Sequence, residues 1–148
     1  TNGNGAVAAV TSASAQLAGK LLVDVSNPLD FSGAGPALSV AGADSVGERL
    51  QRALPDTTVV KALNTVNCAV MVDPGLVPGE HVVFVCGNDA DAKARTTALL
   101  GEFGWPAERV LDIGDITGAR ATEGYLLLWL RLAARTGSAP LNIAIRRG

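Results

Sequence analysis

The chain has 148 residues and a formal net charge of −2, and 18% of its residues are charged. A chain of this length can bury one sizeable core, so we expect a single domain over residues 1–148. Its twelve Lys and Arg residues are scattered, and the apolar run at 126–130 is far shorter than the roughly 20 residues of a membrane span. We therefore expect neither nucleic acid nor a membrane as a partner.

A glycine separates the first expected helix from the first expected strand. Apolar residues recur at helical spacing over 6–17, and Gly19 stands where a left-handed helix cap belongs. The apolar run 21–25 is typical of a buried strand in a parallel sheet, and Pro28 ends it. The loop over 28–42 is longer than most such connections, which indicates a functional role.

The pattern then repeats and continues to the end of the chain. Asp44 or Ser45 is expected to cap a helix over 45–54, and a second strand over 58–63 again ends at an asparagine, Asn64. Beyond it we expect a short helical turn at 68–72, strands at 82–86 and 109–113, helices at 89–103 and 117–135, and a half-exposed terminal strand at 141–146.

This alternation predicts an α/β fold with a largely parallel sheet covered by helices. Helices separate most consecutive strands, and a parallel pair requires such a crossover. We expect the sheet to be parallel through its main body, with strands near 21–25, 58–63, 82–86 and 109–113, and the direction of the terminal strand is left open. Because ligands bind at the carboxyl ends of strands in such sheets, the tips at Ser26–Asn27 and at Asn64 are candidates for a site.

A glycine-rich segment at the start of the chain has two interpretations. Residues 3–8 match the dinucleotide fingerprint G-x-G-x-x-A, and Asp24 follows at about the expected distance of roughly 20 residues. The fingerprint works only when a strand feeds its first glycine, and only two residues precede Gly3. The other interpretation is a loop that opens an ordinary helix covering the sheet.

From the second strand onward the sequence resembles a known family. Residues 59–66 (VVKALNTV), followed by 84–89 (FVCGND), resemble the deazaflavin-dependent NADP oxidoreductases. The same pair is similar to the cytoplasmic oxidoreductase domains of the membrane metalloreductases called six-transmembrane epithelial antigens of the prostate. Both families also fit residues 23–28, 112–115, Ala119-Arg120, Glu123 and Leu128-Trp129.

The resemblance implies an incomplete Rossmann-like fold in which this chain is the carboxyl-side part. The true phosphate-binding turn and the basic residue for the 2′-phosphate would precede Thr1. It also implies NADP as cofactor, with a deazaflavin (coenzyme F-420) or a flavin ring against the nicotinamide. The implied cofactor-binding residues are Thr1, Asn2, Asn27, Pro28, Asn64, Thr65 and Val66.

Two of these segments receive separate roles from the resemblance. Asn27 and Pro28 match the turn that borders the nicotinamide, and residues 64–66 match the lining of the second ring's pocket. In the metalloreductases an aromatic residue follows shortly after that lining. This chain has Asn67-Cys68-Ala69 there, which leaves the second substrate open.

The titratable residues fit a reaction that needs no acid–base catalyst. Hydride transfer between two rings requires that they be held face to face, so we expect no catalytic side chain. His81 is expected at a strand end on the surface, Cys68 as a small buried apolar residue, and Cys86 in the core. Asp24 is expected to be a buried carboxylate bonded to backbone amides. The cysteines lack metal-ligand spacing, so reduced thiols in a cytoplasmic protein are expected.

The predicted function is an NADP-dependent oxidoreductase that exchanges hydride with a small-molecule donor or acceptor. The alternative is a nucleotide-binding sensor or assembly module without turnover, because fold does not fix function. The apolar stripe on the 117–135 helix, with Tyr125 and Trp129 one turn apart, is expected in the core or in a subunit contact. From it we expect the complete protein to be a homodimer.

Overall fold

A four-stranded sheet organises the computed structural model, which describes residues 3–146 and 148. Thr1 and Asn2, which the resemblance assigns to the cofactor, lie outside the described residues. The strand order is β1-β4-β5-β6. The strands are β1 (Leu21–Asp24), β4 (Thr58–Ala62), β5 (Val83–Gly87) and β6 (Val110–Asp112).

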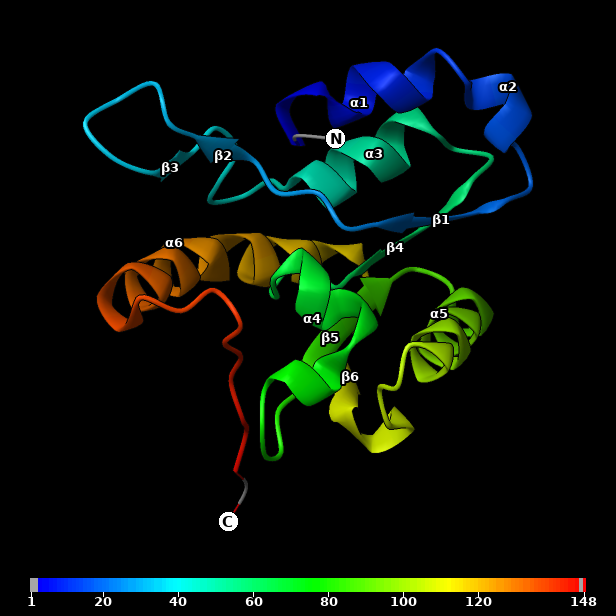
Figure 1. Ribbon diagram of the computed structural model, residues 1–148. Coiled ribbons are helices and arrows are strands. Elements are labelled where there is room, and N and C mark those ends of the chain that lie inside the picture. The colour runs from blue at the N-terminus through cyan, green and yellow to red at the C-terminus, as the bar shows by residue number, and fades with distance from the viewer. Residues whose placement is uncertain (1–2, 147) are drawn as a thin grey trace.

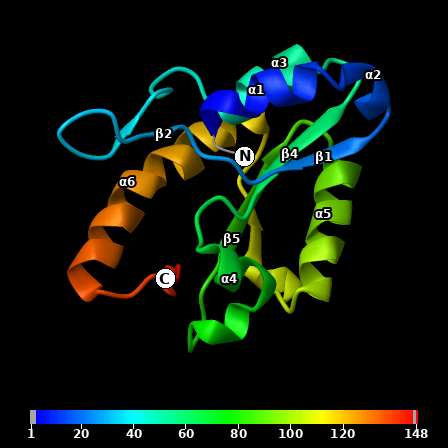
Figure 2. The ribbon, with the colours of Figure 1, turned by 45° about the horizontal axis from the view of Figure 1, so that its top comes forward.

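Helices cover both faces of this sheet (Figure 1). α1 (Gly3–Thr11) and α3 (Val46–Ala53) lie together on one face, and α5 (Ala90–Glu102) covers the other. The carboxyl half of α6 (Ala119–Thr136) extends away from the sheet (Figure 2). No helix in the described part of the chain combines the length and apolarity needed to cross a bilayer.

Strand β4 separates two hydrophobic cores because its side chains alternate between the faces. Val59 packs in the cluster beneath α1 and α3, which also contains Leu50. Val60 and Ala62 pack in the cluster beneath α5, which also contains Leu100. The continuous apolar run that predicted this strand is therefore explained by burial on both sides.

The expected largely parallel sheet is confirmed, with one pair of strands that differs. β1 pairs with β4 and β5 pairs with β6 in parallel. β4 and β5 are antiparallel, so the expectation of parallel strands is wrong at this pair. The connection between them contains only the five-residue α4 (Cys68–Val72) and a short 3-10 turn, and it enters β5 at the carboxyl end of β4, so no long helix crosses the sheet there.

The predicted terminal strand at 141–146 is also wrong, because this segment has no regular structure. Its backbone contributes one bond to the sheet, from the Val82 N–H to the Ile143 carbonyl at 3.0 Å. The neighbouring Val82 carbonyl accepts instead from the side chain of Asn142, at 2.8 Å. Because the Asn142 side chain, and not a backbone N–H, bonds to the Val82 carbonyl, the backbone pairing of this segment with Val82 stops after one hydrogen bond.

The remaining elements refine the predicted boundaries. The expected 6–17 helix is divided into α1 and α2 (Ser14–Leu17), and Gly19 is left-handed with φ of 71°. Ser45 caps α3, and Asp89 caps α5. The long loop contains a small antiparallel pair, and short 3-10 helices occur elsewhere: β2 (Leu29–Asp30), β3 (Ala37–Leu38), η1 (Pro74–Leu76), η2 (Ala107–Arg109) and η3 (Ile116–Gly118).

Candidate functional site

The carboxyl ends of β1 and β4 bring two predicted site residues into direct contact. The Asn27 amide donates to the Asn64 carbonyl at 2.8 Å, and the Asn64 amide donates to Asn27 Oδ1 at 3.0 Å. This pair follows from the parallel register, in which Asp24 lies beside Lys61. The two asparagines therefore form one unit at the sheet edge. The side-chain oxygen of Asn64 takes no part in the bonds between them.

The turn that follows β4 holds its residues in an unusual conformation. Leu63 has a φ of 59°, in the left-handed region that branched side chains seldom occupy. Thr65 is only 1% exposed, and its Oγ1 has no hydrogen-bond partner among the described residues. A strained backbone conformation and a buried hydroxyl without a hydrogen-bond partner are both features often found at functional sites.

The other predicted site residues differ in their exposure. Pro28 is buried, and Val66 packs in the core beneath α5. Ser26, next to Asn27, is 9% exposed and has an Oγ without a partner in the described structure. The hydroxyls of Ser26 and Thr65, both without a partner in the described structure, are thus in the residues next to the asparagine pair. Unpaired hydroxyls at this position are consistent with a ligand that has hydrogen-bonding atoms.

The start of α4 excludes one structural role for Asn64. Asn67, not Asn64, caps this helix, with its side chain accepting from the Ala69 N–H. Cys68 is exposed, so its prediction as a buried apolar residue is wrong. As the first residue of a five-residue helix, it lies on the solvent side.

Behind the asparagine pair lies a charged residue that was missed as a site candidate. Lys61 is fully buried in β4, and its Nζ lies 2.7 Å from Asp24 Oδ2 and 2.8 Å from Glu123 Oε1. Lysine within an apolar strand is the available sequence signal, because a buried ammonium needs charged partners. The prediction of Asp24 as a buried carboxylate bonded to backbone is confirmed, since its Oδ1 accepts from the Ser26 N–H.

A second ion pair joins α3 to α6 beside this cluster. Arg120 donates to Glu48 Oε2 from its Nε at 2.9 Å. Hydrogen bonding from Arg120 lowers the pKa of the Glu48 carboxyl. Burial raises this pKa, but by less than the bonds to Arg120 and Ser45 lower it, so Glu48 stays charged at neutral pH.

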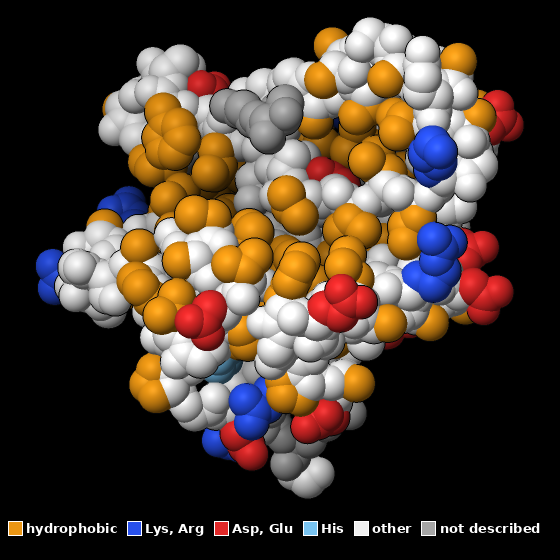
Figure 3. Space-filling view, turned by 45° about the vertical axis from the view of Figure 1, so that its right-hand side comes forward, with side chains coloured by type: hydrophobic (Ala, Val, Ile, Leu, Met, Phe, Trp, Pro, Cys, Tyr) orange, Lys and Arg blue, Asp and Glu red, His pale blue; other side chains and the backbone are white. Residues whose placement is uncertain are grey.

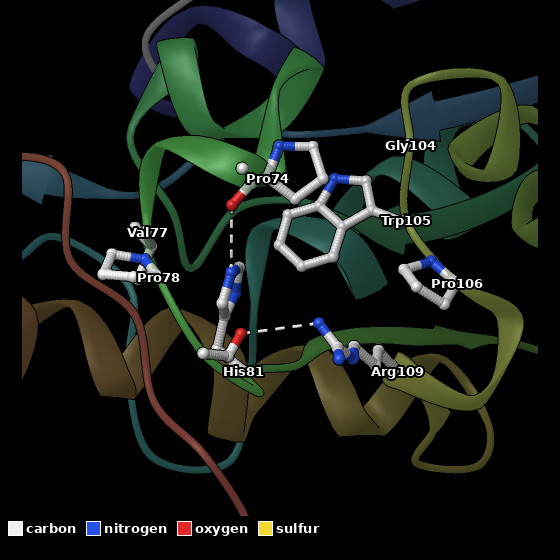
Figure 4. Close-up of a pocket in the computed structure, with 10 residues that line it drawn as sticks. Pro74, Val77, Pro78, His81, Gly104, Trp105, Pro106 and Arg109 are labelled. Atoms are coloured by element: carbon white, nitrogen blue, oxygen red, sulfur yellow. Dashed lines mark hydrogen bonds between the residues drawn. The ribbon is translucent and has the colours of Figure 1, made fainter.

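A separate cavity of about 290 Å³ lies between the loop at 74–79 and residues 104–109 (Figure 4). His81 lines it and is only 4% exposed, so its predicted surface role is wrong. Its Nε2 bonds to the Pro74 carbonyl, and its Nδ1 bonds to the Asn142 amide. Trp105 packs edge-on against the His81 ring and donates to the Met71 carbonyl. Because the ring nitrogens of His81 and Trp105 already bond to protein atoms, this cavity is a structural feature and not the candidate site.

Apolar side chains are prominent on the surface. On the face seen in Figure 3 they gather across the middle, while Lys and Arg side chains lie mostly toward its rim. On α6, Leu128 is 54% exposed, and Leu127 and Leu132 are each more than a third exposed. Tyr125 and Trp129 are half-buried, and their polar atoms are shielded from solvent without a partner among the described residues.

The asparagine pair and its surroundings suit binding and orientation more than acid–base work. The groups at the edge are neutral amides and hydroxyls, and the nearest charges are paired behind them. Burial raises the pKa of the Cys86 thiol to about 12, so it stays protonated. In the described residues no group of three His, Cys, Asp or Glu is arranged to hold a metal ion.

Known proteins resemble this chain over most of its length. No family model matches the sequence. It is 34% identical over 112 residues to the metalloreductase STEAP3 of Rattus norvegicus, covering 76% of this chain and 21% of that protein. It is 30% identical over 132 residues to the F420-dependent NADP reductase of Methanocaldococcus jannaschii, covering 88% of this chain and 58% of that protein. The chain thus spans about half or less of these two relatives.

Two solved structures extend the comparison. A crystal structure from Arthrobacter sp. FB24, of a protein named as an F420-dependent NADP reductase, is 49% identical with a TM-score of 0.95. That match covers 99% of this chain and 67% of the other. The hypothetical protein SMa0349 of Sinorhizobium meliloti is 28% identical, with a TM-score of 0.56 over 74% of this chain and 53% of its own. These matches agree with the Rossmann-like α/β architecture described above.

Proposed function

Because this chain belongs to the F420-dependent NADP reductase family, we propose that it forms part of an oxidoreductase that transfers hydride between NADP and a deazaflavin. The observation that carries the proposal is the 49% identity at a TM-score of 0.95 over nearly the whole chain. The match covers 99% of the chain, so the aligned residues include loops at the sheet edge, and loops often carry binding residues. The resemblance to STEAP3 supports the wider class of reductase.

The asparagine pair is proposed to hold the reacting edge of the nicotinamide. Asn27 and Asn64 brace each other, which fixes the tips of two neighbouring strands. The buried hydroxyls of Ser26 and Thr65, which have no hydrogen-bond partner in the described structure, lie in the residues next to this pair and support a polar ligand there. When bound, NADPH would give a hydride to the oxidised deazaflavin, or NADP+ would take one from the reduced deazaflavin. The chain's role is to orient the nicotinamide ring and exclude water from it.

The acceptor is proposed to be F420 in preference to a flavin. Asn67, Cys68 and Ala69 provide no aromatic ring to stack on a flavin. The two matched reductases named for F420 support the same choice. Pro28, with its fixed backbone, and Val66, with its apolar side chain, are proposed to limit how the two rings approach each other.

Turnover with different acceptors tests this proposal. The protein, in its full natural length, is mixed with NADPH and F420, and the absorbance of the reduced nicotinamide is followed. FMN, FAD and NADH serve as the comparison acceptors and donor. Fast oxidation with NADPH and F420 is expected. Binding of NADP without turnover by any acceptor would instead support the nucleotide-binding sensor.

We also propose a homodimer and a cytoplasmic location. The exposed leucines of α6 support the dimer, because an apolar helix face that leaves the body of a protein is typical of subunit contacts. The free thiols of Cys68 and Cys86 support a reducing compartment.

A further inference from the structure

Lys61 forms a complete set of bonds inside the protein. An ammonium group has three donors, and the acceptors of Lys61 are Asp24 Oδ2, Glu123 Oε1 and the Ser26 carbonyl at 2.5 Å. The side chains of Lys61, Asp24 and Glu123 are 0%, 4% and 2% exposed. Glu123 is also bound by two N–H groups at the start of α3, those of Val46 and Gly47.

Two of these charges hold the same residue at the tip of β1, one at each of its two peptide units. Asp24 Oδ1 accepts from the Ser26 N–H at 2.9 Å, and Lys61 Nζ donates to the Ser26 carbonyl. Ser26 is therefore fixed at both its backbone groups. The next residue is Asn27, whose side chain bonds to Asn64.

Stability alone does not account for these charges. A buried ion pair loses its hydration, so replacing it with apolar side chains is often neutral or stabilising. The cluster lies at the ligand edge of the sheet, and its bonds end on the backbone that carries Asn27. Its placement is better explained by the geometry that it imposes there.

We propose that Lys61 and Asp24 are positioning residues for hydride transfer, which hold the Ser26–Asn27 backbone in the place that orients the nicotinamide. Glu123 provides the balancing charge and ties the cluster to α3 and α6. This inference rests on the proposed function, since it assigns these residues a role in that reaction.

Two matched substitutions separate positioning from stability, because each neutralises one buried, ion-paired carboxylate. Asp24 uses two oxygens, one for Ser26 and one for Lys61, so Asp24→Asn loses an acceptor at the β1 tip. Glu48 is also buried, but it bonds to Ser45 and Arg120 and to no member of the Lys61 cluster. Glu48→Gln is therefore the control.

In the full-length protein, Asp24→Asn is expected to lower kcat with NADPH and F420 by about tenfold, with KM for NADPH changed by less than about threefold. Glu48→Gln is expected to change kcat by less than about twofold, whatever its effect on Tm. Hydrogen exchange gives a readout without cofactor: the Ser26 amide should exchange at least about tenfold faster in Asp24→Asn only.

The outcomes distinguish this inference from the proposed function. Equal losses of kcat in the two variants, or an unchanged Ser26 amide in Asp24→Asn, would overturn the positioning role. Absence of hydride transfer by the unsubstituted protein would overturn the proposed function, and with it the role of Lys61 and Asp24 in that reaction. The exchange rate of the Ser26 amide would still show whether Asp24 fixes the Ser26 backbone. Should Asp24→Asn fail to fold, Asp24→Asn combined with Lys61→Met removes both charges of the pair and must give the same loss of kcat.

Discussion

At the scale of single residues, Asn64 shows how a buried amide acquires a defined neighbour. It is 2% exposed and follows a left-handed Leu63, and its amide donates to a residue 37 positions earlier in the chain. The cost of the Leu63 conformation is of order 1–3 kcal/mol. The surrounding packing has to offset that cost, because this turn brings Asn64 against Asn27.

Replacing Asn64 with Leu should lower hydride transfer by at least about tenfold per folded molecule. Leucine is similar in size but cannot donate to Asn27 Oδ1, so only the bond from the Asn27 amide to the backbone carbonyl of residue 64 still joins the two strand tips. The melting temperature should fall only moderately, since one hydrogen bond contributes about 1 kcal/mol. Turnover with NADPH and thermal melting are measured on the same preparation.

Asp89→Ala provides the control for this experiment. Asp89 caps α5 through the Ala92 N–H, and loss of such a cap costs about 1 kcal/mol. Its turnover per folded molecule should equal that of the unsubstituted protein. If Asn64→Leu behaved like Asp89→Ala, losing stability alone, Asn64 would have no role at the nicotinamide.

At the scale of elements, α6 is tied to α3 by a charge pair whose strength depends on pH. Because Arg120 lowers the pKa of Glu48 below its ordinary 4.5, this pair stabilises the fold above that pH. The contribution is lost as the pH falls through the lowered pKa. Arg120→Gln should therefore lower the Tm at neutral pH and leave it unchanged in strong acid.

Thermal melting between about pH 7 and pH 2 checks this prediction. The two proteins should differ in Tm at neutral pH and converge as the solution becomes acidic. A constant difference across the whole range would mean that Arg120 acts through packing and not through the charge of Glu48.

The exposed face of α6 predicts a dimer contact. Leu128→Glu places a charge where Leu128 is 54% exposed, and burying that charge at an interface would be costly. Sedimentation at micromolar concentration should show a dimer for the unsubstituted full-length protein and a shift toward monomer for the variant. Leu99→Glu on α5, where the leucine is 39% exposed, should leave the dimer intact. A monomer in every case would contradict the prediction.

At the scale of the whole molecule, the strands and their order of appearance follow from local sequence, but the direction of β5 does not. Apolar runs between Gly, Pro and Asn predicted all four strands to within one or two residues. The reversal at β5 depends on where the 63–82 segment packs, and α4 is too short to show this in its periodicity. The predicted terminal strand is absent because the Asn142 side chain bonds to the Val82 carbonyl in place of a backbone N–H, and alternation of apolar residues does not reveal such a contact.

The candidate site was partly accessible from sequence. Asn27 and Asn64 could be placed together because each ends a strand, and parallel neighbours end at one edge. Lys61 stands in the same motif, but its partners lie 37 positions before it and 62 positions after it, on β1 and α6. Contacts at such separations are set by tertiary packing, which no local pattern encodes.

The 148 residues alone are predicted to bind NADP only weakly. The Gly3 N–H, which the fingerprint would offer to phosphate, instead donates to the Asn27 carbonyl at 3.1 Å. A Cβ on Gly3 would lie 2.4 Å from that carbonyl oxygen, so this glycine serves close packing of α1 on the β1 tip. Calorimetry on these residues should give a dissociation constant well above micromolar. Micromolar binding would restore Gly3–Ala8 as a phosphate-binding segment.

The reversal of β5 makes the ligand edge a composite of two kinds of structure. One half consists of strand endings, at Asn27 and Asn64, while the other consists of the segments that enter β5 and β6, around His81 and Arg109. Entry segments can change in length and sequence without disturbing the strand endings. Relatives could therefore exchange one redox partner for another through these segments, while the nicotinamide side of the scaffold stayed the same.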